Sequence, residues 1–189
     1  MNITTIRIAL AALLIGTAGA GAQHKGSGSG SGLESQPPPT ASYSGFDKRK
    51  VASFSDVDMA AMLDGRGMGF ALPAEINGYP GPMHVLELAD QLGLTPVQRS
   101  AMQQLFERMK VRAQQAGARY VAAEQAVDQA FRSGNANAFI IADLVREADQ
   151  RRAEKRLAHL ETHLEAAPLL TAEQLANYAA LRGYGKNVQ

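Results

Sequence analysis

The sequence contains no cysteine and no tryptophan, and aromatic residues make up only 6% of its 189 positions. Without cysteine there can be no disulfide, no thiolate metal site, no cysteine nucleophile and no cysteine for lipid attachment. Any metal site must therefore be built from His, carboxylate or Met side chains. The net charge is +1, from 19 basic and 18 acidic residues, and gives no argument for nucleic acid or a membrane surface as a partner.

Long apolar runs are also scarce, and the run near the N-terminus predicts a secretory signal peptide. Arg7 precedes apolar residues 8–15, and small residues then offer cleavage sites at Ala18-Gly19-Ala20 and Ala20-Gly21-Ala22. The run is shorter than the roughly 20 apolar residues of a transmembrane helix, and a retained N-terminal anchor is the alternative interpretation. An exported protein without cysteine fits the bacterial periplasm.

The residues after the signal peptide are poor in core-forming side chains. A Gly-Ser repeat over residues 26–32 and three prolines at 37–39 are typical of a flexible, extended tether. Ser55 then caps a short helix from Asp56 to Leu63, and several glycines interrupt the chain between this helix and residue 80. The expected division is signal peptide, disordered tether, short helix with loop, helical domain and tail, at residues 1–22, 23–55, 56–80, 81–184 and 185–189.

The domain over residues 81–184 is predicted to be all-α. Its apolar residues recur at the i, i+3, i+4, i+7 spacing of helix faces, between recognisable start and stop signals. We expect four helices, at Gly81 to Gly93, Thr95 to about Phe131, Asn135 or Asn137 to about Ala166, and Thr171 to Gly183. In the third helix the predicted core stripe is Ala153, Leu157, Leu160 and Leu164.

The short connection at Ser133-Gly134 forces the two long helices to run antiparallel. One hairpin cannot cover its own apolar stripe, and the short flanking helices cover only part of it. The predicted fold is therefore a long antiparallel helical hairpin with short flanking helices, forming a cradle-like homodimer with a second copy.

Two helix starts share one motif. Thr95 and Thr171 each stand three residues before a glutamine, Gln98 and Gln174, in the spacing of a capping box. Satisfying unpaired backbone N–H groups explains these residues, at on the order of 1 kcal/mol per cap. We therefore interpret them as helix-capping residues rather than binding residues.

The full motifs, Leu94-Thr95-Pro96-Val97-Gln98 and Leu170-Thr171-Ala172-Glu173-Gln174, carry a family resemblance. A pair of Leu-Thr-x-x-Gln motifs in a secreted helical chain resembles the Spy/CpxP family of periplasmic proteins, which includes ZraP-like and CnrX-like branches. The resemblance covers about Pro82 to Tyr184. It implies a cradle-shaped helical dimer that acts without ATP on unfolding envelope proteins, or takes part in envelope and metal stress responses.

If residues equally far before and after the turn lie side by side, basic residues gather over the central third of the hairpin. With adaptable methionines nearby, such a surface suits weak, promiscuous capture of unfolded chains. The alternative is an ordinary solvated helix face with pairs such as Glu147 with Arg151. The candidate client-binding surface comprises Met102, Met109, Arg112, Arg119, Arg151, Arg152, Lys155 and Arg156.

The remaining candidate chemistry is a pair of histidines, His159 and His163, at the i, i+4 spacing that lets two imidazoles reach one metal ion. His84 is a possible third nitrogen ligand. Both residues of the pair lie off the predicted core stripe and are expected to be accessible, so ordinary surface histidines are the alternative. A carboxylate could come from Glu165 or Glu107, and the ion would be Zn, Ni, Co or Cu, with no cofactor required otherwise.

An enzyme is not expected. The sequence shows no phosphate-binding loop, no strand signal and no nucleophile with a positioned base, and the His pair lacks the glutamate placement of a zincin. Sparse aromatics and the export signal also argue against a nucleic-acid role. Two functions remain: a chaperone-like protein that binds unfolded envelope proteins, and a metal-binding sensor or resistance protein that signals to a membrane sensor or anti-sigma partner.

Overall fold

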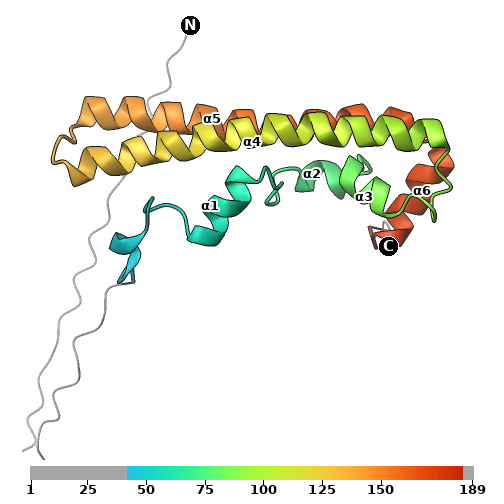
Figure 1. Cartoon of the computed structure of the whole chain (residues 1–189), viewed down its shortest axis with the longest axis horizontal. Coiled ribbons are helices and arrows are strands. Elements are labelled where there is room, and N and C mark those ends of the chain that lie inside the picture. The colour runs from blue at the N-terminus through green and yellow to red at the C-terminus, as the bar shows by residue number, and fades with distance from the viewer. Residues whose placement is uncertain (1–41, 185–189) are drawn as a thin grey trace, which may run out of the picture. The chain divides into compact units, whose positions relative to one another are not determined.

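The computed structural model describes residues 42–184 and shows a helical domain (Figure 1). Within these residues there is no strand, which confirms the predicted all-α class. None of the helices in this range combines the length and the apolar character that a membrane crossing needs. The predicted signal peptide, the first part of the predicted tether and the C-terminal tail lie outside the described residues.

Two long helices, α4 (Pro96–Arg132) and α5 (Ala138–Ala166), lie antiparallel and side by side (Figure 1). Gly134 turns the chain between them with a φ of 73°, a left-handed conformation that glycine adopts without strain. Asn137 then caps α5 by accepting hydrogen bonds from two backbone N–H groups. Ion pairs bridge the two helices at Arg108–Glu165, Arg112–Glu161 and Arg119–Glu154.

The residues before the hairpin form an N-terminal strap, defined here as residues 42–81, which runs along one side of it (Figure 1). The strap contains the 3-10 turn η1 (Phe46–Lys48), α1 (Asp56–Leu63) and α2 (Leu72–Glu75). Ser55 caps α1 as expected, whereas α2 lies in a stretch predicted to be loop. The next helix, α3 (Pro82–Glu87), is shorter than predicted, and turns continue the chain to Gly93.

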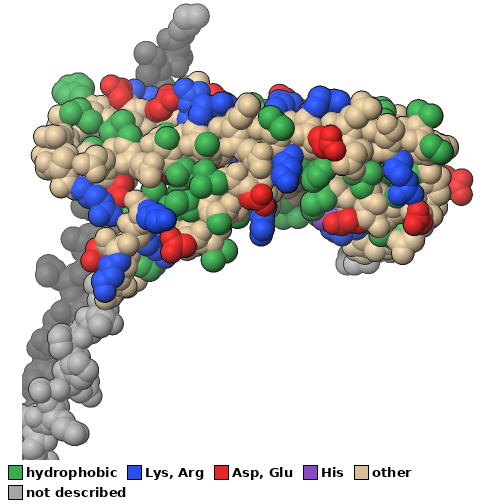
Figure 2. Space-filling view, in the orientation of Figure 1, with side chains coloured by type: hydrophobic (Ala, Val, Ile, Leu, Met, Phe, Trp, Pro, Cys, Tyr) green, Lys and Arg blue, Asp and Glu red, His purple; other side chains and the backbone are tan. Residues whose placement is uncertain are grey.

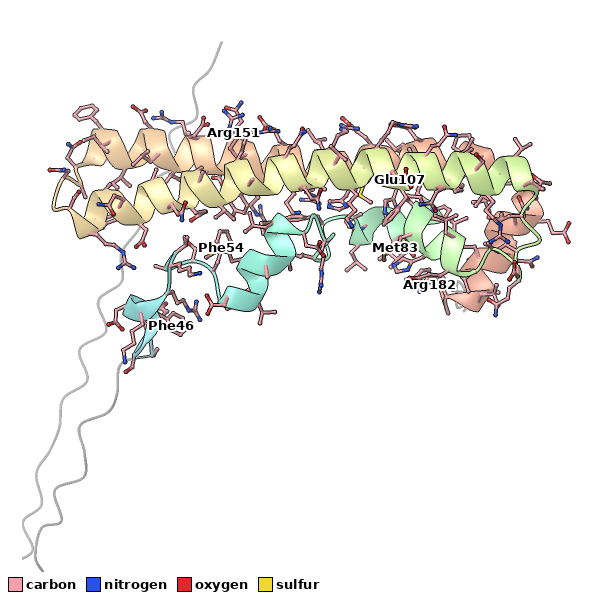
Figure 3. All side chains as sticks on the ribbon, in the orientation of Figure 1. Phe46, Phe54, Met83, Glu107, Arg151 and Arg182 are labelled. Atoms are coloured by element: carbon pink, nitrogen blue, oxygen red, sulfur yellow. The ribbon has the colours of Figure 1, made fainter. Side chains whose placement is uncertain are left out.

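The last part of the predicted tether is packed rather than disordered. Val51 is 0% exposed, and Phe54 meets Tyr120 of α4 edge to face, with ring centroids 5.4 Å apart. Phe54 lies where the strap approaches the hairpin (Figure 3). The tether prediction is therefore corrected at Val51 and Phe54, which follow a Gly-, Ser- and Pro-rich stretch and yet are buried.

The C-terminal end of α1 is seated on the hairpin at Gly117. A Cβ at this position would overlap the carbonyl oxygen of Met62, so only glycine allows the approach. From α5, the ammonium group of Lys155 donates a hydrogen bond of 3.3 Å to the same oxygen. Lys155 is 0% exposed, and burial lowers its pKa to about 8.

The end of the hairpin opposite the turn at Gly134 is closed by η2 (Ala167–Leu169) and α6 (Ala172–Leu181). Both predicted capping boxes, at Thr95 and Thr171, are present with their side-chain and backbone bonds. The core at this end comprises Val85, Ala89, Leu92, Leu94, Met102, Leu105, Ala166, Leu170 and Tyr178.

The predicted core stripe of α5 faces mainly solvent rather than the core. Leu157 and Leu164 are 50% and 58% exposed, and Leu160 is partly buried. Small and polar side chains face inward instead, because alanine and threonine let α5 approach its neighbours closely. The buried residues of α5 are Ala148, Lys155, Ala158, His159, Thr162, His163 and Ala166.

Candidate functional site

A cavity of about 630 Å³ lies between the strap, α3 and the hairpin. Among residues 42–184, all three histidines and three of the six methionines line it. The predicted metal ligands therefore share one cavity, although they come from distant parts of the sequence. These lining residues are His84, His159, His163, Met68, Met83 and Met109.

His159 is a buried histidine with a free ring nitrogen. Its side chain is 5% exposed, and its Nε2 atom has no hydrogen-bond partner among the described residues. Burial lowers its pKa to about 4, and the nearby Lys155 and His163 add to that shift. The ring is therefore neutral at physiological pH and keeps a nitrogen lone pair for a ligand.

His163, one helical turn further along, is oriented by the strap. Its Nδ1 atom lies 2.7 Å from the carbonyl oxygen of Tyr79, and because a carbonyl can only accept, Nδ1 carries the proton. In the neutral ring the other nitrogen, Nε2, is then unprotonated. Gly81 leaves space for this ring, since a Cβ there would lie 2.9 Å from Nε2. A histidine that donates one N–H to a carbonyl is the usual arrangement of a metal-bound imidazole.

Glu75 anchors the cavity, a role that no sequence motif indicates. Its carboxylate is buried and accepts hydrogen bonds from the Tyr178 hydroxyl and, at 3.0 Å, from the Gly81 N–H. Burial and the hydrogen bond to Glu75 raise the pKa of the Tyr178 hydroxyl. The carboxylate also lies 3.7 Å from Nδ1 of His163 and 3.6 Å from Nε of Arg182. A single glutamate in a loop-like stretch gives no signal of such contacts.

The accessibility predicted for the histidine pair is wrong. The pair projects toward the strap because the small residues around it, rather than the leucines, face inward. Figure 2 accordingly shows histidine surface only in a small area below the hairpin. His84 remains partly exposed, and its Nδ1 lies 2.8 Å from a carboxylate oxygen of Glu87.

Neither carboxylate suggested from the sequence lines the cavity. Glu165 pairs with Arg108 at 3.8 Å, and Glu107 accepts a hydrogen bond of 2.8 Å from Gln103 on the surface of α4 (Figure 3). Within residues 42–184 no three His, Asp or Glu side chains are already placed to hold one metal ion.

The predicted basic client-binding surface is not assembled. Met102 and Met109 are core residues at 0% and 9% exposure, and Lys155 is buried beneath α1. Arg112, Arg119 and Arg151 pair with glutamates, so basic and acidic side chains alternate along the hairpin (Figure 2). Arg152 lies 5.5 Å from the ring centroid of Phe70, and Arg156 is exposed.

The two capping motifs contact each other. The amide nitrogen of Gln98 donates to the side-chain oxygen of Gln174 at 2.8 Å, and that of Gln174 lies 3.2 Å from the side-chain oxygen of Gln98. Each amide also donates to a backbone carbonyl, of Leu169 and Leu92 respectively. The motifs therefore join the starts of α4 and α6, beyond capping each helix.

No family model, no curated protein and no solved structure matches this chain. The domain is thus defined by its own features: a helical hairpin, a strap along one side and a cavity lined by histidine and methionine.

Proposed function

We propose that this protein binds a metal ion in the cavity beneath the strap and serves as a periplasmic heavy-metal sensor or resistance protein. The observation that supports this function best is the buried pair His159 and His163. One ring has an unpartnered Nε2, and the other is oriented through Nδ1 by the carbonyl oxygen of Tyr79. A buried polar atom without a partner costs about 1–3 kcal/mol, and a metal ion bound at Nε2 would remove that cost.

The strap makes this site suitable for sensing. Tyr79, Gly81 and Glu75 all belong to it and contact the ring or the surroundings of His163. An ion held by α5 would therefore alter the packing of the strap, and a partner such as a membrane sensor could detect that change.

Titration calorimetry of the purified protein with Zn, Ni, Co and Cu ions tests the proposal. We expect binding that is lost in the double variant His159→Ala/His163→Ala. His24→Ala is the control, because it removes one histidine outside the described part of the chain and leaves the pair in place. Equal heats in the wild type and the double variant would contradict the proposal.

A second candidate function is ATP-independent binding of unfolded envelope proteins, and an exposed apolar row supports it. Leu157 and Leu164 lie two turns apart on the side of α5 opposite its buried face, and they are 50% and 58% exposed. Exposed leucines of this kind are available to an unfolded chain, or to a second copy in a cradle-like homodimer.

Suppression of client aggregation separates this function from metal binding. We expect Leu157→Ser/Leu164→Ser to reduce suppression and Val57→Ser, at another exposed apolar position, to leave it unchanged. If the wild type fails to suppress aggregation at stoichiometric ratios, this second function is removed.

A further inference from the structure

Besides the histidine pair, the cavity is lined by three thioethers, those of Met68, Met83 and Met109, together with His84 and the carboxylates of Asp64 and Glu75. Met68 and Met83 are 41% and 44% exposed, whereas Met109 is 9% exposed. Two of the three lining methionines are thus accessible to solvent, and the third is buried. Long unbranched methionine side chains can adjust to a bound ion at little cost.

Met68 is also held in an uncommon backbone conformation. Its φ is 45°, and it is the non-glycine residue with positive φ in the described part of the chain. Glycines at 67 and 69 flank it, so glycine would be the unstrained choice at 68 as well. Strain of this kind, retained at a side chain that lines a cavity, indicates a role for that side chain.

The cavity is lined by three cationic side chains, Arg66, Lys110 and Arg182, against two carboxylates, Asp64 and Glu75, and this excess of positive charge favours an ion of low charge. Lys155, a buried residue of α5 one helical turn before His159, adds a further cation near the histidine pair, and Arg182 lies beside Glu75 with its Nε atom 3.6 Å from the carboxylate. Repulsion between a fixed cation and a bound ion is proportional to the charge of the ion. A monovalent ion therefore experiences half the repulsion that a divalent ion does.

The methionine and histidine side chains of the cavity are donors that soft metal ions prefer. Thioether sulfur and imidazole nitrogen together suit Cu(I), whereas hard divalent ions favour oxygen ligands. We propose that the cavity binds a soft monovalent cation, Cu(I) or its analogue Ag(I), through Nε2 of His159 and His163, with methionine sulfurs completing the site. This inference rests on the proposed metal-binding function and specifies the class of ion.

The decisive variant is Met68→Leu/Met83→Leu, which removes two exposed sulfurs while nearly conserving volume, so that folding is not at risk. Met59→Leu is the matched control, because Met59 belongs to the strap but does not line the cavity. The measurements are Cu(I) affinity under anaerobic reducing conditions by chelator competition, Ag(I) and Zn affinity by calorimetry, and copper K-edge absorption.

The proposal predicts that Cu(I) and Ag(I) bind more tightly than Zn. It also predicts that the Leu double variant binds both ions at least tenfold more weakly, with a reduced sulfur signal in the copper absorption spectrum and unchanged Zn affinity. Zn binding at His159 and His163 that equals or exceeds Cu(I) binding, with no effect of the Leu variant, would overturn the soft-ion inference and leave the proposed function standing. Absence of any metal binding would overturn both.

Discussion

Replacing Gly117 by alanine tests whether the strap is held on the hairpin in the way that the structure shows. Gly117 lies inside the long helix α4, and at an exposed helix interior the change to alanine stabilises a protein by about 1 kcal/mol. Here the new Cβ would overlap the carbonyl oxygen of Met62 and lie 3.5 Å from Nζ of Lys155. Because the obstacle is backbone, α1 must move away to accommodate it.

The cost can be worked out from the contacts that α1 gives up. Moving it breaks the hydrogen bond from Lys155, worth roughly 2 kcal/mol for a charged donor. It also exposes Met62, now 3% exposed, at roughly 2 kcal/mol. After the gain of about 1 kcal/mol in helix propensity, the net loss is about 3 kcal/mol.

Two assays report on this variant. Denaturant unfolding gives the free energy of unfolding, and amide hydrogen exchange should show faster exchange across α1 while α4 and α5 stay protected. Ala118→Gly, at the exposed neighbouring position, is the control and should cost about 1 kcal/mol without changing exchange in α1. A Gly117→Ala protein that is more stable than the wild type would refute the seating of α1 on Gly117.

Further predictions concern pH, the motif contact and association. The pKa of Lys155 is lowered to about 8 in the folded state, so the unfolded chain binds more protons than the folded chain above that pH. The free energy of unfolding should therefore rise by about 1–2 kcal/mol between pH 8 and 9.5, and the Lys155→Met variant should not show this rise. A double-mutant cycle of Gln98→Ala and Gln174→Ala, measured by chemical denaturation, should give a coupling energy of about 1 kcal/mol, whereas simple additivity would show that the amides act only as separate caps. In sedimentation velocity at micromolar concentration we expect a dimer that Leu157→Ser/Leu164→Ser weakens, and a stable wild-type monomer would argue against a homodimer.

Helix class and helix starts could be predicted because they depend on local chemistry. The caps at Thr95 and Thr171 satisfy backbone groups within their own first turn, and the structure shows both. Which face of α5 is buried could not be predicted in the same way, because that depends on how closely the neighbouring elements approach it. Its alanines and threonine allow that approach, so Leu157 and Leu164 remain outside.

The candidate site could be predicted only in part, because it also depends on contacts between elements that are distant in sequence. The spacing of His159 and His163 indicated that both rings share a helix face, but their burial depends on the strap, which composition had assigned largely to tether and loop. Glu75 and Met68 lie in that strap and have no sequence pattern around them. The role of Glu75 depends on a contact with Tyr178, far along the chain, and Met68 shares its cavity with histidines that are equally distant in sequence.

The central claim, that His159 and His163 bind a metal ion through Nε2, is tested most directly by nitrogen NMR of the histidine side chains during separate titrations with Ag(I) and with Zn. We expect an Nδ1–H tautomer for His163 before addition, and a joint change of the Nε2 signals of His159 and His163 that is complete at one equivalent. Nε2 signals of this pair that stay unchanged with both ions, with or without changes at the other histidines, would contradict the claim.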